Sequence, residues 1–427
     1  MKALVGALAA LFATPAVAVP VASVEVVRDG DKWTAEYRLS KKAPVWVFPD
    51  SIEAREQKGS WRAGSWKVLT PGVRLERRGW YDVLVADRGD VPQNVTLSFT
   101  PFVRDIEAAY DAALAFTDGS VALYDGKFKI FPAASAEVVD KFPIDPTGIA
   151  GTEVATRVLM RDEAGPVLMH GRRTSVATRD EVGAYVLFGK AEPVEAAAMT
   201  TVIDPGLPRW LASFLKSSIP AALNSYAQKL GPAPGGKPLL MVSWAGPTPG
   251  ARSMGGSVLP STIVMTFEGE GVTMENEDLR NGARWFAAHE GAHFWLGNSV
   301  HYSGPQESWI TEGGADLLAY RAVAAADPNF DVRGALQEAL EQCITFSRKR
   351  RHRQCQRAGR PQGLLSLRRY FRARGGKCVR RRFRRLRARP DRCQSRGQAG
   401  HARRVAGGAG YPRAGEGLRQ SDWQAPR

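Results

Sequence analysis

Cysteine and long apolar runs are what this chain most lacks. All four cysteines, Cys343, Cys355, Cys378 and Cys393, lie in the last fifth of the 427 residues, so the preceding body contains none. No disulfide can therefore cross-link that body. Beyond the first 18 residues no stretch approaches the roughly 18 consecutive apolar residues of a transmembrane helix, so a stable membrane span is not expected.

The amino terminus has the pattern of a secretory signal peptide over residues 1–18. Lys2 supplies the positive start, Ala3–Ala13 the apolar run, and Ala16–Ala18 a small-residue cleavage site. We therefore expect an exported protein, periplasmic or secreted by a bacterium. An uncleaved membrane anchor is the alternative.

The positive charge of the chain is concentrated in its last part. The net charge is +16, but residues 343–427 hold 26 Lys and Arg against three acidic residues. The remaining residues hold 33 basic and 40 acidic side chains, as an ordinary acidic protein would. Two interpretations of the tail, residues 347–427, compete: a genuine arm that binds nucleic acid or an anionic surface, or a reading-frame error. The frame error is favoured, because only Lys349 and Lys377 are lysines and no periodicity would bury a face.

One short motif carries most of the chemical information. His289-Glu290-Gly-Ala-His293 is an H-E-x-x-H pattern, and Glu312 follows after eighteen residues. Two histidines four apart on a helix project from one face, so both imidazoles can reach one metal ion. Glu290 could take a proton from water beside that ion, and Glu312 would be the third protein ligand.

The surroundings of the motif predict two helices. Residues 280–297 form a mostly apolar segment that ends at Gly297, and residues 308–323 form a second segment that carries Glu312. The alternative is two satisfied core histidines and a surface carboxylate. Histidine and glutamate on an apolar helix require partners when they are buried, which favours a metal site.

The sequence HEGAHFWLGN, followed by ESWITEGGADLLAY, resembles the gluzincin aminopeptidases, the group of membrane alanyl aminopeptidase and leukotriene A4 hydrolase. The resemblance covers residues 281–321. It implies a thermolysin-like domain in which Zn²⁺ is bound by His289, His293 and Glu312, with Glu290 as the general base. Asp316 matches a carboxylate that orients a zinc histidine in such enzymes, with an exposed helix carboxylate as the alternative.

Two signatures of that group are altered here. Its Gly-x-Met-Glu-Asn glutamate, which holds the substrate's amino end, has no clear equivalent. Glu275 lies too close to His289 and is expected at a helix start, whereas residues 254–258 are better placed but contain no glutamate. The group's oxyanion-binding tyrosine would fall in the tail, where Tyr370 is not expected to replace it. Aminopeptidase specificity is therefore left open.

The rest of the chain predicts a multidomain protein. Residues 19–205 are β-rich, with short alternating segments such as 33–39, 45–48, 80–86 and 95–99, and with hairpins expected at Asp118-Gly119 and Asp125-Gly126. Trp61, Trp66 and Trp80 are expected to pack in the core, with carbohydrate stacking as the alternative. Residues 206–346 form an α/β catalytic domain, thermolysin-like and incomplete, with a helix over 207–230 and strands over 238–244 and 261–267. The tail, 347–427, is expected to be disordered.

These observations favour an exported zinc-dependent metallopeptidase that acts on peptide or protein substrates. The first alternative is a catalytically weak member of the fold that acts as a binding protein. The second is a protein that binds nucleic acid or an anionic surface through its tail, although an exported zinc enzyme meets little nucleic acid. His301, just past the first metal helix, is expected to be an exposed loop histidine, with substrate contact as the alternative. No role is assigned to His170.

Overall fold

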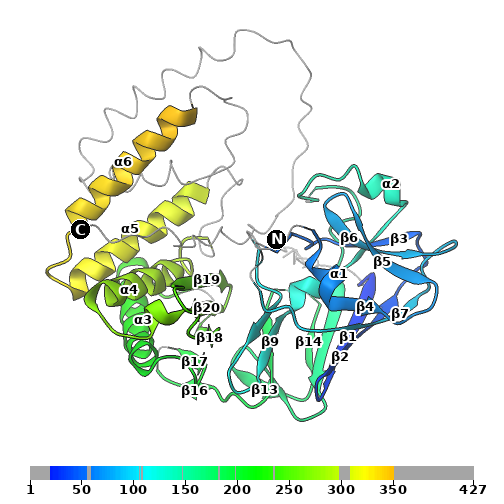
Figure 1. Ribbon diagram of the computed structural model, residues 1–427, viewed down its shortest axis with the longest axis horizontal. Helices are drawn as coiled ribbons and strands as arrows, with labels where there is room; N and C mark the ends of the chain where they lie inside the picture. Colours follow the sequence, from blue (N-terminus) through cyan, green and yellow to red (C-terminus); the bar gives the residue numbers. More distant parts are fainter. Residues whose placement is uncertain are drawn as a thin grey trace, which may run out of the picture.

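The computed structural model describes residues 20–350, except for 55–58, 105, 107–108, 147, 181–182, 198, 234–235 and 298–307. Over these ranges the chain forms a β-rich amino-terminal unit and a second unit in which helices cover one sheet (Figure 1). The predicted signal peptide, His301, Tyr370 and the chain beyond Arg350 lie outside the described residues. Among the described residues, no helix is both long and apolar enough to cross a membrane.

The amino-terminal unit contains three sheets, as its alternating segments predict. The first has the order β14-β11-β1-β2-β7-β4 and consists of Ala177–Arg179, Thr156–Asp162, Ala22–Asp29, Lys32–Leu39, Asn94–Phe99 and Trp66–Val68. The second has the order β10-β3-β6-β5 and consists of Phe131–Ala133, Val45–Phe48, Tyr81–Ala86 and Val73–Arg78. The third has the order β13-β12-β15-β9-β8 and consists of Arg172–Thr174, Val167–Met169, Tyr185–Phe188, Val121–Tyr124 and Ala113–Ala115. Short helical segments are α1 (Trp61–Ser65), η1 (Asp125–Phe128) and α2 (Ala136–Val139).

The first hairpin shows why these residues form strands. In β1, Val24 and Val26 are fully buried while Ser23 and Glu25 are only partly covered, so one face of the strand enters the core. Strands β1 and β2 pair as far as Asp29, the last residue of β1, and Lys32, the first residue of β2, across a two-residue turn. Gly30 stands in that turn at φ 58°, a conformation that glycine adopts without steric cost.

The second unit is built on one mixed sheet of order β16-β17-β18-β20-β19, formed by Val194–Glu195, Thr200–Ile203, Leu239–Trp244, Thr262–Glu268 and Ser253–Leu259. Strands β17, β18 and β20 are parallel, and every residue of β18 is buried, as expected of a strand covered on both faces. The remaining elements are α3 (Arg209–Leu230), η2 (Glu270–Val272), α4 (Glu277–Ala292), α5 (Ser308–Ala326) and α6 (Val332–Arg350). Strands β16 and β17 precede the predicted domain boundary at 205/206 but belong to this sheet.

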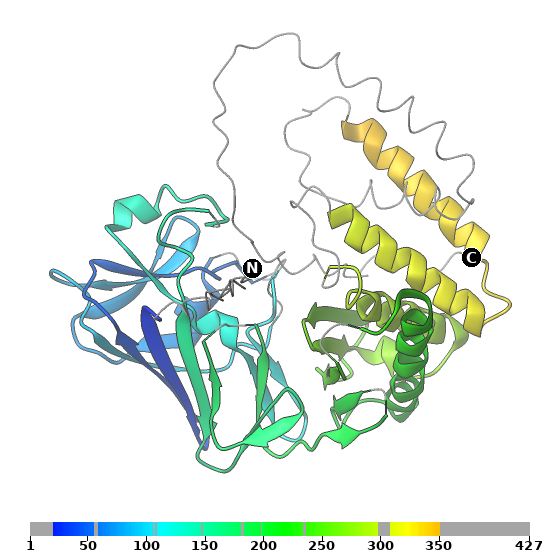
Figure 2. The same cartoon turned by 180° about the vertical axis from the view of Figure 1, so that it is seen from behind.

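The two faces of this sheet contact different parts of the molecule. One face carries Leu240, Ile263 and Met265, which pack with the apolar residues of α3, α4 and α5 in one core. The other face, with Met241 and Val264, packs against residues of the third amino-terminal sheet. The sheet therefore lies between the helices and the amino-terminal unit (Figure 2).

Several sequence predictions need correction. Trp61 and Trp66 are buried as expected, but Trp80 follows the turn at Gly79 and is 50% exposed. Asp118-Gly119 does form the β8–β9 hairpin. Asp125-Gly126 does not form a hairpin and instead opens η1, because the Asp125 carboxylate accepts hydrogen bonds from distant backbone amides.

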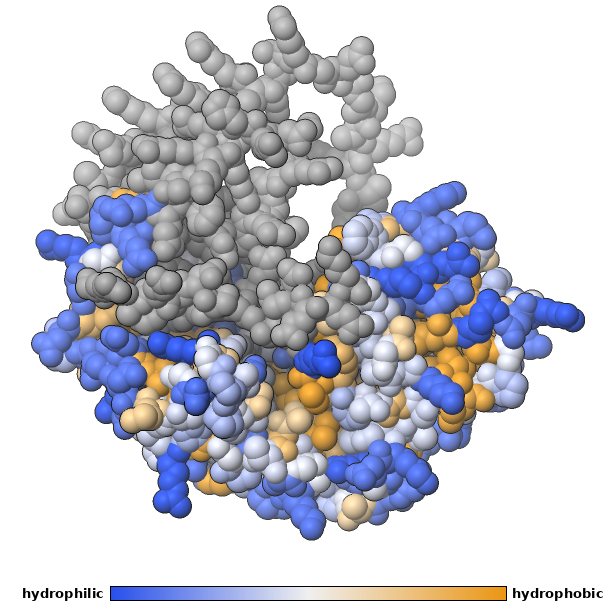
Figure 3. All heavy atoms as spheres, viewed as in Figure 1, coloured by the Kyte–Doolittle hydropathy of each residue, from blue (hydrophilic) through white to orange (hydrophobic). Residues whose placement is uncertain are grey.

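Polar and charged side chains cover most of the described surface on the face drawn in Figure 3, and apolar side chains reach it in places over the amino-terminal unit. Trp80, Leu69 and Val103 are among the exposed large apolar residues of this unit. Such scattered exposure is ordinary for a folded protein and assigns no site by itself.

Candidate metal centre

Helix α4 places the two histidines of the motif. It begins at Asn276, whose side chain accepts a hydrogen bond from the Leu279 amide at 2.9 Å, a favourable N-cap. Its regular part ends at Ala292, five residues earlier than predicted, and His293 is the C-cap. His289 and His293 still project toward each other, and their Nε2 atoms are 3.2 Å apart.

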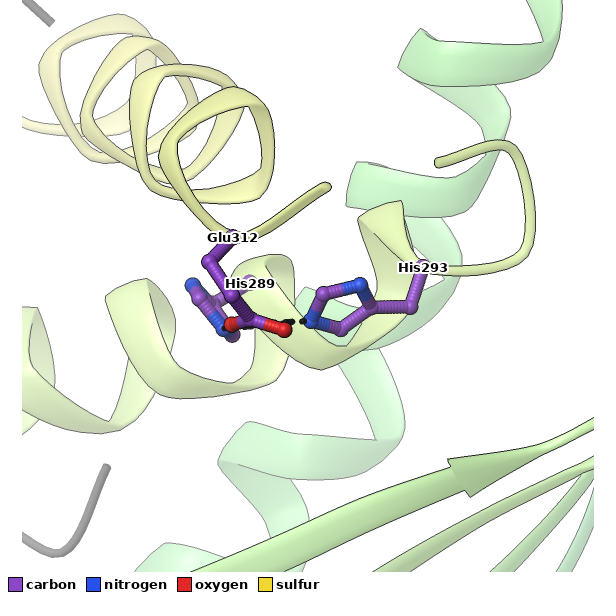
Figure 4. Close-up of side chains that lie close together, drawn as sticks. All are labelled: His289, His293 and Glu312. Carbon is purple, nitrogen blue, oxygen red and sulfur yellow. Dashed lines mark hydrogen bonds and ion pairs between the residues drawn. The ribbon is translucent and has the colours of Figure 1, made fainter. Parts of the chain in front are cut away.

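Helix α5 brings Glu312 to the same point. Its Oε2 atom lies 3.3 Å from Nε2 of His289 and 3.6 Å from Nε2 of His293. Figure 4 shows the three side chains converging from neighbouring helices. Among the described residues, these three are the set of histidine, cysteine and acidic side chains close enough to share one metal ion, with ligand atoms all within 4.8 Å.

The Nδ1 atoms of His289 and His293 point away from the centre, and their hydrogen bonds determine that the Nε2 atoms face it. Nδ1 of His289 lies 2.9 Å from Oδ1 of Asp316, and Nδ1 of His293 lies 3.2 Å from the carbonyl oxygen of Leu296. A carbonyl can only accept a hydrogen bond, and an ionised carboxylate likewise, so each Nδ1 carries the proton. In the neutral tautomer with the proton on Nδ1, each ring turns the lone pair of Nε2 inward. Two such lone pairs and a carboxylate oxygen meet at one point, which a cation would satisfy.

The spacing and donor types fit Zn²⁺. Zinc binds imidazole nitrogen and carboxylate oxygen at about 2.0–2.2 Å, so neighbouring donors of a tetrahedral site lie roughly 3.3 Å apart. The observed separations of 3.2, 3.3 and 3.6 Å are close to that value. Three protein donors leave one tetrahedral position for another ligand, which is the arrangement of catalytic rather than structural zinc sites.

Asp316 is buried and is not the exposed helix carboxylate of the alternative interpretation. Its exposed fraction is 0%, and it lies one helical turn after Glu312 on α5, on the same side of the helix. The ring of Trp285, one turn before His289 on α4, lies 5.2 Å from the His289 ring. His289 is therefore held by a hydrogen bond at its edge and by an aromatic contact.

Glu290 lies on the side of α4 that faces strand β19. It is 5% exposed, and a Cβ atom added at Gly256 would lie 3.4 Å from its Cγ. Burial raises the pKa of Glu290 above its ordinary value, while His289 and His293 oppose the shift. A buried carboxyl with a raised pKa beside a metal site is suited to accept and release a proton.

The acidity of the ligands is strongly coupled. Burial alone would raise the pKa of Glu312, but the neighbouring histidines hold it well below its usual range. Burial alone would lower the pKa of His293, and the Glu312 carboxylate outweighs it, so this pKa is raised. Both directions have one cause, the attraction between the Glu312 carboxylate and the imidazoles that it faces.

Two residues that the sequence left open lie away from these ligands. Glu275 immediately precedes the cap of α4, its side chain is 43% exposed, and it pairs with Arg280 at 3.0 Å. It is thus a helix-start carboxylate in this structure. His170 lies between β12 and β13 with φ 49°, and it contacts Ser261 at 3.0 Å and Arg179 at 2.8 Å, which links the two units.

Sequence reasoning missed two side chains near the centre. Tyr110 belongs to the amino-terminal unit, yet its hydroxyl donates a hydrogen bond to the carbonyl of Val258 on β19 at 3.0 Å. Tyr226 on α3 donates to the carbonyl of Ala288, directly before His289, at 3.1 Å. Neither contact leaves a sequence signal, because the partners are 148 and 62 residues apart.

A comparison with protein-family models finds no match, and a comparison with curated proteins finds none either. Among solved structures, the chain is similar to an aminopeptidase N family protein from Idiomarina loihiensis, with 10% identity and a TM-score of 0.46 over 74% of this chain and 56% of that one. It is also similar to native leukotriene A4 hydrolase from Saccharomyces cerevisiae, with 13% identity and a TM-score of 0.39 over 76% of this chain and 51% of that one.

A further similar structure is the yeast leukotriene A4 hydrolase in complex with bestatin, with 13% identity and a TM-score of 0.39 over 77% of this chain and 52% of that one. Both names belong to the gluzincin group that the motif around His289 resembles. The chain spans about half the length of these solved structures. The overall likeness is weak, so inferences about chemistry rest on the side chains at the centre.

Proposed function

We propose that this chain is a zinc-dependent metallopeptidase, with His289, His293 and Glu312 as the ligands and Glu290 as the general base. The observation that carries the proposal is the convergence of two histidine Nε2 atoms and one Glu312 carboxylate oxygen. The Nδ1 atoms of the two histidines are bonded to Asp316 and to a backbone carbonyl, which orients both rings. A single metal cation would satisfy all three acceptors at that spacing, and the donor set is one that zinc prefers.

The reaction would be hydrolysis of a peptide bond by water. Bound Zn²⁺ would supply Lewis acidity, polarising the scissile carbonyl and lowering the pKa of water. Glu290 would accept a proton from the attacking water and then deliver it to the leaving amine. Asp316 would keep His289 in the tautomer that binds metal and would hold the orientation of its ring. The export predicted from residues 1–18 remains part of the proposal and rests on the sequence.

The Glu290→Gln substitution tests the assignment in the full chain. The amide keeps the shape of the side chain but cannot accept the proton, so hydrolysis should fall about 10²–10⁴-fold. Bound zinc, measured by inductively coupled plasma mass spectrometry, should stay near one atom per chain. His289→Ala should instead lose the metal.

Two outcomes would contradict the proposal in different ways. If the chain given excess Zn²⁺ retains no stoichiometric metal, the ligand assignment is wrong. If zinc is retained but the chain and its Glu290→Gln variant process a peptide library equally slowly, the chain is a metal-containing binding protein, the first alternative. Deleting residues 347–427 tests the second alternative, since an activity carried by the tail would disappear.

A further inference from the structure

Among the described residues, β19 is the last strand of its sheet. Hydrogen bonds locate its free edge, the edge that pairs with no other described strand. The carbonyl of Ser261, directly before β20, accepts a hydrogen bond from the Leu239 amide at the start of β18 at 2.9 Å. The carbonyl of Phe267 on β20 accepts one from the Ala245 amide, directly after β18, also at 2.9 Å. The odd-numbered residues of β20 therefore direct their backbone groups toward β18. Because backbone direction alternates along a strand, Val264 and the other even-numbered residues direct theirs toward β19.

The register of β19 then assigns its free groups. Ser257 stands directly opposite Val264, so both exchange hydrogen bonds within the sheet. Its neighbours Gly256 and Val258 must point their N–H and C=O groups away from the sheet. These residues, together with Met254, form the free edge of β19.

The free edge passes directly beside the proposed general base. A Cβ atom on Gly256 would lie 2.6 Å from Phe286 and 3.4 Å from Cγ of Glu290. Only a residue without a side chain fits this approach between strand and helix. An extended peptide that pairs with Gly256 would therefore have its backbone next to Glu290. Addition of a strand to a sheet edge is a general way to bind extended peptides.

Two residues further along, the edge is already occupied. The hydroxyl of Tyr110 donates to the outward carbonyl of Val258 at 3.0 Å. A peptide pairing with β19 would need that same carbonyl, and the phenol ring would stand in its path. The free edge thus ends between Gly256 and Val258.

Tyr110 is held rigidly by its own unit. Its ring lies 4.7 Å from the ring of Tyr124, which in turn lies 5.4 Å from the ring of Tyr185. The hydroxyl of Tyr185 donates to the carbonyl of Asp111, the residue after Tyr110, at 2.8 Å. This stack belongs to the apolar cluster that joins the two units, so Tyr110 is placed by the contact between them.

We propose that Tyr110 is a specificity-determining residue that limits how far a bound peptide can extend on the amino-terminal side of the cleaved bond. Strand β19 runs from Ser253 to Leu259, and antiparallel pairing, which is the more stable kind, places the amino end of the peptide toward Val258. The inference rests on the proposed function, since it concerns the substrate of the same site. With Tyr110 in this position, the site would accept peptides that have few residues before the cleaved bond.

Binding measured without cleavage tests the limit. The parent peptide is Leu-Ala-Ala-Ala with a carboxyl-terminal fluorescein-lysine, and two series add one to three alanines at its amino end or at the carboxyl end ahead of the label. Dissociation constants are measured by fluorescence anisotropy on the zinc-loaded, full-length Glu290→Gln chain. The same series are measured on this chain with Tyr110→Ala added, and with Tyr110→Phe added. Tyr81→Phe is the matched control, because Tyr81 also donates to a backbone carbonyl, that of Pro143, within the amino-terminal unit.

The expected result is specific to one end of the peptide. With Tyr110 present, alanines added at the amino end should not strengthen binding. With Tyr110→Ala, the amino-end series should gain about fivefold for each backbone hydrogen bond recovered, and Tyr110→Phe should give a smaller gain by freeing the Val258 carbonyl alone. The carboxyl-end series, and both series on the Tyr81→Phe chain, should not change.

Equal effects of Tyr110→Ala on both series, or no effect on either, would overturn the inference. If the alanine variant loses zinc or its folded circular dichroism spectrum, the phenylalanine variant decides, since it removes one hydroxyl. Cleavage of the same peptides by the unsubstituted chain is followed by mass spectrometry. If the Tyr110 substitutions change peptide binding but no peptide is cleaved, the peptidase activity is refuted and the limit set by Tyr110 stands. If peptides are cleaved but the Tyr110 substitutions change no dissociation constant, the limit is refuted and the peptidase activity stands. Absence of binding by any zinc-loaded chain would refute both.

Discussion

The Asp316→Asn substitution isolates the residue that fixes the metal-binding tautomer of His289. Asp316 is fully buried, and its Oδ1 lies 2.9 Å from Nδ1 of His289. The amide keeps the volume of the carboxylate but removes its charge, and its NH₂ group can donate to Nδ1. Donation would move the ring proton to Nε2, the atom that must bind the metal. Loss of such a partner typically weakens metal binding about 10–100-fold, which is about 1.4–2.7 kcal/mol.

Competition with a chromophoric chelator measures this loss directly as a zinc dissociation constant at fixed pH. The control is Asp278→Asn, which removes one negative charge from the exposed first turn of α4. Because that position is exposed to solvent, its charge should be screened, and the zinc affinity should change little. The comparison therefore separates a hydrogen bond to the ligand from a general effect of charge.

Equal zinc affinities for the two variants would refute the reasoning. The ring of His289 would then be oriented without Asp316, for example by its contact with Trp285. A loss of zinc that is accompanied by a lower stability of the metal-free chain would point to packing instead. Urea unfolding of both variants in the presence of the chelator distinguishes these cases.

Two further predictions concern the fold around the site. Gly256→Ala should destabilise the chain by about 1–3 kcal/mol in urea unfolding, because its Cβ would overlap Phe286. The control Gly64→Ala adds a Cβ that meets nothing within 4 Å and should be neutral or stabilising. Equal effects of the two substitutions would contradict the close approach of β19 to α4. Burial raises the pKa of Asp125 to about 6, so the folded state binds this proton more tightly than the unfolded state. The free energy of unfolding should therefore fall by up to about 3 kcal/mol as pH rises from about 4 to 6. Asp125→Asn should remove that part of the pH dependence, and identical pH profiles of unfolding free energy for the parent and the variant would refute it.

The parts of the structure that the sequence predicted are those set by local geometry. The segment predicted over residues 33–39 is confirmed as part of β2, where burial alternates every two residues as its sequence does. The strand predicted over residues 45–48 is confirmed as β3, a short apolar run whose four residues are all buried. The convergence of His289 and His293 follows from helical spacing in the same way. Glu312 and Asp316 lie four apart, so one helix brings both to the metal centre.

The failures have equally physical causes. Trp80 sits at a turn, where no periodicity indicates which side is covered, and its size alone suggested burial. Asp125-Gly126 has the composition of a hairpin turn. Instead, the Asp125 carboxylate accepts hydrogen bonds from the amides of Gly183 and Ala184, more than fifty residues away. This tertiary contact overrides the local preference for a hairpin turn.

The metal centre and the limit at Tyr110 differ in how much of the molecule each requires. His289, His293, Glu312 and Asp316 fall within 28 residues, so two adjacent helices suffice to assemble the donors. The end of the free edge requires the contact of two units, since Tyr110 reaches Val258 across 148 residues of chain. A substitution that weakens the contact between units, without touching a ligand, should therefore leave zinc affinity intact and relax the choice of peptide. The proposed chemistry thus depends on α4 and α5 alone, whereas the proposed selectivity depends on how the amino-terminal unit contacts β19.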